Sequence, residues 1–191
     1  MSDATPSRAT TADPVVRLLG LVLIGAAVSV ALGIYGRLHE PTFKSITTFG
    51  IFTNTLTMKV WLTTIVVVLA LVQLTTALVI FGKLKIGAAG TPGWVSPTHR
   101  WSGRIAFLLS IPVAYHCLWS LGFQSDTTRV VLHSLLGCFF YGVFVTKMLV
   151  LHSRRLPGWA LPWAGGLTFT AVVAIWLTSA LWYFTTVGVE F

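Results

Sequence analysis

The sequence predicts an all-α integral membrane protein, a bundle of five transmembrane helices with its amino terminus in the cytoplasm. Of the 191 residues, 55% are hydrophobic and 9% are charged, whereas about 25% of the residues of an ordinary soluble domain are charged. Five apolar runs are each long enough to cross the hydrocarbon core, which takes about 20 residues of helix. They cover approximately residues 15–35, 60–81, 101–121, 130–151 and 167–189. The remainder is too short for a separate soluble domain.

The segments between these runs differ in length and composition. Residues 1–13, MSDATPSRATTAD, are polar, and we expect a disordered cytoplasmic tail before a single membrane domain over residues 14–191. The loop of residues 37–59 is long enough for a surface helix or a re-entrant segment. Its His39 is expected to be solvated, with a substrate or proton site as the alternative. The loop FQSDTTR is so short that the third and fourth spans should be antiparallel neighbours.

The basic residues are unevenly distributed between the two ends of the spans. Basic residues near spans are retained in the cytoplasm, so the end with more of them is expected inside. Nine lie at the end that includes the amino terminus and four at the other: Arg8, Arg17, Lys83, Lys85, Arg100, Arg104, Lys147, Arg154 and Arg155 against Arg37, Lys44, Lys59 and Arg129. We therefore expect a multi-pass protein of the plasma membrane, surrounded by the lipid bilayer. The net charge of +8 follows from this topology and does not indicate a nucleic-acid partner.

Four histidines lie near the ends of the third and fourth spans. His99 and His116 are on the third span, and His133 and His152 are on the fourth. In an antiparallel hairpin His99 is level with His152, and His116 is level with His133. Ionisable residues inside a membrane are costly and usually functional. Each level could therefore hold a haem between two axial imidazoles. The alternative is that the histidines make hydrogen bonds between helices.

A glycine follows a histidine by four residues in each span, in HRWSG and HSLLG. Gly103 and Gly137 therefore share a helix face with His99 and His133, respectively. A glycine lets a flat macrocycle approach the backbone closely, although small residues also serve helix packing in membranes. These two glycines are candidate haem contacts.

Basic residues also lie near both histidine pairs. Arg100, Arg104 and Lys147 lie near His99 and His152, and Arg129 lies near His133. Such cations could pair with haem propionates. Snorkelling at the ends of spans explains the same residues without a ligand.

The histidine and glycine pattern resembles that of the dihaem b cytochromes of the ascorbate and ferric-reductase type, over about a third of the chain. This resemblance implies one or two haem b groups as cofactor. The stretches HRWSGRIAFLLSIPVAYHCLW, HSLLGCFFYG and LPGWALP look more closely like a family of uncharacterised actinobacterial five-span membrane proteins with a domain of unknown function. That similarity extends over most of the chain and implies no activity.

The leading functional hypothesis is a membrane b-type cytochrome, a candidate oxidoreductase subunit that carries electrons through bis-His haems. Quinone and an extracytoplasmic redox protein are its candidate partners. The alternative is a non-redox membrane subunit or scaffold that binds a partner protein. A carboxylate relay for protons or cations is not expected, because all five acidic residues lie outside the predicted spans: Asp3, Asp13, Glu40, Asp126 and Glu190.

Overall fold

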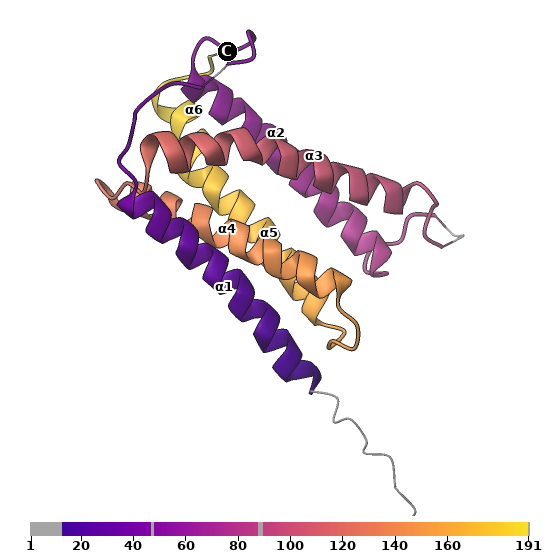
Figure 1. The fold of residues 1–191 in the computed structure, drawn as a ribbon. Helices are drawn as coiled ribbons and strands as arrows, with labels where there is room; N and C mark the ends of the chain where they lie inside the picture. Colours follow the sequence, from indigo (N-terminus) through magenta and orange to yellow (C-terminus); the bar gives the residue numbers. More distant parts are fainter. Residues whose placement is uncertain (1–12, 47, 88–89, 191) are drawn as a thin grey trace, which may run out of the picture.

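The computed structural model describes residues 13–46, 48–87 and 90–190, and these form helices and connecting loops (Figure 1). Five helical rods are long and apolar enough to cross a membrane, so the predicted all-α fold with five spans is confirmed. The rods are α1 (Pro14–Leu38), α2 (Thr55–Ile80), α3 (Val95–Tyr115) with η1 (His116–Leu121), α4 (Thr128–His152), and α5 (Ala160–Trp176) with η2 (Leu177–Leu181) and α6 (Trp182–Thr186). The segments η1 and η2 are π-helical.

The starts of α1 and α2 are capped by side chains that lie outside the apolar runs. Asp13 accepts a hydrogen bond from the Val15 amide at 2.7 Å, with Pro14 in the first turn. Asn54 and Thr57 form a capping box, which starts α2 before the apolar run does. The predicted disordered tail falls almost entirely on residues 1–12, which lie outside the described residues.

The rods form two layers, which Figure 1 shows as α2 with α3 on one side and α1, α4 and α5 on the other. α3 packs along α2, whereas α4 packs between α1 and α5, and α2 also contacts α5. The antiparallel α3 and α4 meet through side chains: the Phe107 ring stacks on Phe144 with centroids 4.4 Å apart, and the Tyr141 hydroxyl donates to Ser110 Oγ at 3.0 Å. The main packing partner of α3 is therefore the preceding helix α2 and not the following helix α4.

The contact between α1 and α4 depends on small residues. A Cβ added at Gly25 would lie closer than 3.0 Å to the Gly142 carbonyl oxygen, and one added at Gly142 would lie equally close to the Gly25 carbonyl. Ser29 and Thr146 are the side chains beside these glycines. Small residues allow membrane helices to approach this closely, so that van der Waals packing holds them together.

Gln73 of α2 holds the amino-terminal part of α3. Its Nε2 donates to the His99 carbonyl and to Ser102 Oγ, the latter at 2.7 Å. A Cβ at Gly103 would lie 3.1 Å from Gln73 Oε1. Gly103 therefore makes room for the Gln73 side chain. This is the helix-packing role that the sequence offered for Gly103 as the alternative to a haem contact.

The loop after α1 lies against η1. The Phe43 amide donates to the Ser120 carbonyl at 3.0 Å, and Ser120 Oγ donates to the Lys44 carbonyl at 2.6 Å. The described part of this loop contains no helix before α2. His39 is half-buried and stacks on Tyr35 with centroids 5.1 Å apart, so the expectation of a solvated His39 was wrong.

Candidate functional site

A cavity of about 510 Å³ lies between the two layers, at the end of the bundle where α2 and α4 begin. We call this end the His133 end and the opposite one the His99 end. Ligand sites in proteins commonly have volumes of about 300–1,000 Å³. Both π-helical segments contribute to its wall, Cys117 and Leu118 from η1 and Ser179 from η2. π-Helical turns inside α-helices are frequent at functional sites.

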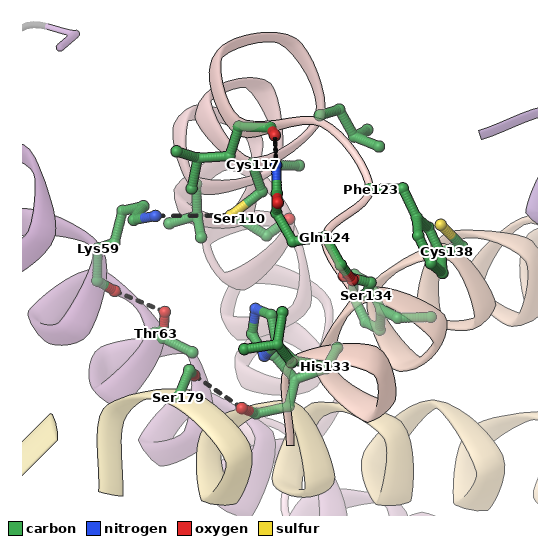
Figure 2. A pocket seen from close by; sticks show the side chains of 18 of the residues that line it. Lys59, Thr63, Ser110, Cys117, Phe123, Gln124, His133, Ser134, Cys138 and Ser179 are labelled. Atoms are coloured by element: carbon green, nitrogen blue, oxygen red, sulfur yellow. Dashed lines mark hydrogen bonds between the residues drawn. The ribbon is translucent and has the colours of Figure 1, made fainter. Parts of the chain in front are cut away.

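The cavity wall is mainly apolar, with a few polar and charged groups at the His133 end (Figure 2). Lys59 donates from Nζ to Cys117 Sγ at 3.8 Å. Arg129 donates to the Thr178 carbonyl at 2.8 Å, and its Cζ lies 3.8 Å from the centroid of the Trp182 ring. An ammonium and a guanidinium retain further N–H donors after these contacts. The cavity can therefore accommodate a largely apolar molecule that carries acceptor oxygens at one end.

His133 lines this cavity from α4, and Figure 2 shows its ring among the other side chains of the wall. Its Nδ1 lies 3.2 Å from Thr178 Oγ1. The Thr178 hydroxyl already donates its proton to the Ala174 or Ile175 carbonyl, at 2.9 and 3.0 Å. A hydroxyl has one proton, so when Thr178 donates to a carbonyl, its oxygen is left to accept from His133 Nδ1. The neutral ring is therefore protonated on Nδ1, and its Nε2 carries the lone pair.

Gly137 lies one helical turn after His133 and also lines the cavity. A Cβ added there would meet no atom within 4 Å. The space over this part of α4 is open, in contrast to the filled space at Gly103. Of the two predicted glycines, Gly137 is the one that borders a ligand cavity.

His116 does not join His133 in this cavity, as far as the described residues go. Its side chain is buried, with 7% of its surface exposed. Its Nδ1 has no hydrogen-bond partner, and the backbone of Lys44 offers its ring an acceptor. The structure thus brings one histidine of the predicted His116–His133 pair into the cavity.

The other predicted pair lies at the His99 end. His99 Nδ1 lies 2.9 Å from Thr76 Oγ1, and that hydroxyl donates to the Val72 carbonyl at 2.6 Å. His152 is exposed, and its Nδ1 donates to the Met148 carbonyl at 2.8 Å. With Nδ1 as the donor in each of these contacts, both neutral rings carry their lone pair on Nε2.

A family model matches residues 18–191 of this chain, which is nearly its whole length. The chain belongs to the family of unknown function DUF6529. The predicted similarity to an uncharacterised family is thereby confirmed. Comparison of this DUF6529 chain with curated proteins and with solved structures gave no match. Within the described ranges, no group of three or more His, Cys, Asp or Glu side chains could hold a metal ion.

The basic residues predicted near the histidines differ from one another in their surroundings in the DUF6529 chain. Arg100 is exposed. Arg104 is also exposed, with its Cζ 5.1 Å from the centroid of Trp101. Lys147 is half-buried, and its charge acts on His99. Among the predicted arginines, Arg129 is therefore the one in the cavity wall.

Sequence reasoning missed two features of the DUF6529 cavity. Lys59 preceded the predicted second span, whereas it lies in the first turns of α2 and lines the cavity. The capping signal of Asn54 and Thr57 could have shown that the helix begins earlier. Thr178, the partner of His133, lies in η2, and no local sequence signal distinguishes a π-helical turn from an α-helical one.

Proposed function

We propose that the chain is a membrane b-type cytochrome that binds haem b in the cavity, with His133 Nε2 as an axial ligand. The observation that carries this proposal is the placement of His133, which lines the cavity with its Nδ1 3.2 Å from Thr178 Oγ1. With Nδ1–H donated to Thr178, the Nε2 lone pair is left for a ligand. Ligating histidines usually donate their other ring N–H to an oxygen acceptor in this way. The bound haem would supply one-electron transfer chemistry.

Gly137, Lys59 and Arg129 fit the same group, while Asp126 is an acidic residue of the wall. The open space at Gly137 would let a flat macrocycle approach α4 beside His133. Lys59 and Arg129 line the cavity and could pair with propionates. In this proposal Thr178 orients the His133 ring, and Lys59 and Arg129 fix the polar edge of the ligand.

A second haem between His99 and His152 is the further part of the proposal. Both rings have the ligating tautomer, with Nδ1 held by Thr76 and by the Met148 carbonyl. Lys147 provides a cation near His99. The haem content per chain tests this second site separately from the first. We further propose that the protein lies in the plasma membrane and exchanges electrons with quinone. Its other proposed partner is a redox protein outside the cytoplasm.

The second candidate function is a non-redox membrane subunit that binds a partner protein. It is favoured by the hydrogen bonds that His99 and His133 make to Thr76 and Thr178, which belong to other helices. Hydrogen bonds between membrane helices stabilise the bundle by about 0.6 kcal/mol on average. In this function the histidines hold the helices together and need no ligand.

Expression with added haem, purification in detergent and absorption spectra before and after reduction by dithionite test the proposal. The wild type should contain about one haem per chain, or two if the His99 end is also occupied. His133→Ala should lose the haem of the cavity. Thr178→Val keeps the imidazole but removes its acceptor, and should weaken haem binding about 10- to 100-fold. His116→Ala is the control and should keep the haem.

The two functions predict different results for the same variants. A non-redox subunit would contain no haem in the wild type even with haem supplied. In that case His133→Ala and Thr178→Val would lower the melting temperature by similar amounts, since each removes the same hydrogen bond. Loss of haem in His116→Ala and His133→Ala alike would instead restore the predicted bis-His pair and contradict the placement of His116 outside the cavity.

A further inference from the structure

A second hollow of about 230 Å³ lies beside the cavity and shares part of its wall. Four residues line both spaces: Leu32, Ala114, Leu118 and Tyr141. Ile111 and Tyr115 complete the hollow. The two spaces are therefore neighbouring compartments separated by a few side chains.

The hollow faces sideways, toward the lipid. α1 packs along α4, and α3 packs along α2, so the gap between α1 and α3 is left to side chains. Ile111 and Tyr115 are 44% and 50% exposed. Leu32 lies six residues before the end of α1, which is about 9 Å of helix. In a bilayer this opening would lie at the depth of the hydrocarbon chains.

The chemistry of the lining restricts what could enter here. The six described residues that line the hollow are uncharged. Moving a charged head past an apolar opening inside a bilayer is costly. A neutral molecule with an apolar tail meets no such cost. The lining thus favours neutral lipids over fatty-acid carboxylates.

The Tyr141 hydroxyl is the polar group where the two spaces meet. It donates to Ser110 Oγ at 3.0 Å, and Ser110 Oγ donates to the Phe107 carbonyl at 2.7 Å. Both hydroxyl protons are used in this relay, so the oxygen of Tyr141 remains as an acceptor. An acceptor at this position matches a ligand head that carries an O–H group.

We propose that a membrane quinol enters the hollow from the lipid between α1 and α3, with its hydroxyl on Tyr141 and its tail in the opening. A quinol combines a neutral head, O–H donors and one apolar tail. This inference rests on the proposed function for its redox meaning, because it names the lipid-soluble partner of the same cavity. The binding itself requires no haem and can be measured separately.

The test uses the full-length protein in lipid nanodiscs and a decyl quinol with a photoreactive diazirine at the tail end. Mass spectrometry of the cross-linked peptides should locate the label on the segments around Leu32 and Ile111. Unlabelled decyl quinol should compete, and dodecanoate should not. Tyr141→Phe removes the acceptor and should weaken quinol competition about tenfold, the effect of losing one hydrogen bond.

Ala114→Trp fills the hollow and should abolish the specific label. Leu108→Trp is the matched control, because it adds the same side chain to a 62% exposed position on the same helix. Leu32→Trp narrows the opening from the α1 side and gives a second blocked variant if Ala114→Trp does not fold. Labelling that persists in the blocked variants, or competition by dodecanoate but not by quinol, would overturn the inference.

Absorption spectra of the same preparations separate this inference from the proposed function. Specific labelling by the quinol without any bound haem would overturn the cytochrome proposal and support the quinol site. Bound haem without specific labelling would support the cytochrome and overturn the lateral site.

Discussion

Replacing Gly25 by alanine should weaken the contact between α1 and α4. The added Cβ would lie closer than 3.0 Å to the Gly142 carbonyl oxygen, whereas ordinary contact begins at 3.4 Å. The two backbones must therefore separate by at least 0.4 Å, the difference between these values. Overpacking of this kind costs about 1–3 kcal/mol. The exchange of glycine for alanine in a helix offsets about 0.5–1 kcal/mol of this cost.

Gly20→Ala is the matched control, because a Cβ at Gly20 on the same helix meets no atom within 4 Å. Both variants gain the same helix preference, so their difference of about 1–3 kcal/mol isolates the clash. Thermal unfolding in one detergent should show a melting temperature about 2–12 °C lower for Gly25→Ala than for Gly20→Ala, by the relation for domains of this length. Equal melting temperatures for the two variants would refute the close crossing of α1 and α4.

Three further predictions concern the rest of the bundle. Gln73→Leu removes the hydrogen bonds to the start of α3 and should lower the unfolding free energy by about 0.6–1.7 kcal/mol, measured by thermal unfolding; an unchanged stability would contradict the role of this residue. Arg129→Ala removes the cation over the Trp182 ring and should change the tryptophan emission spectrum at a stability cost of about 0.5–2 kcal/mol. Topology reporters after Gly90 should report cytoplasm and those after Ser45 the outer side, because the end of the bundle that includes the amino terminus has the excess of basic residues. The reverse pattern would invert the predicted orientation.

The five spans could be predicted because their signal is local: each is a run of apolar residues of sufficient length. The predicted starts were late where helices extend into less apolar sequence, as α5 begins at Ala160 and α3 at Val95. These extensions contain interfacial residues that a hydropathy pattern leaves out. Capping residues such as Asn54 give a better signal for the first turn.

The candidate site was predicted only in part. His133 and Gly137 could be proposed from their spacing, and both line the cavity. The partner of His133 could not, because hydrogen bonding to Thr178 depends on how α4 packs against η2. His116 was expected opposite His133 on the assumption that α3 and α4 pack closely side by side. α3 packs along α2 instead. Two residues at the same depth in the membrane can therefore face different helices, and depth alone did not predict the neighbour of His116.

The two π-helical segments set the rotational phase of the helix ends beside the cavity. Each i→i+5 hydrogen bond encloses one residue more than the α-helix requires, so the residues beyond it are turned by about 100° relative to an uninterrupted helix. Deleting a single residue within His116–Leu121 or Leu177–Leu181 would convert the segment to α-helix and leave the residues beyond it on their present faces. The change would fall on the cavity-lining side chains of the segment itself, such as Cys117 or Ser179. A one-residue gap at either position in another member of the family would therefore mark a chain with a different cavity wall, even where the rest of each span aligns without a gap.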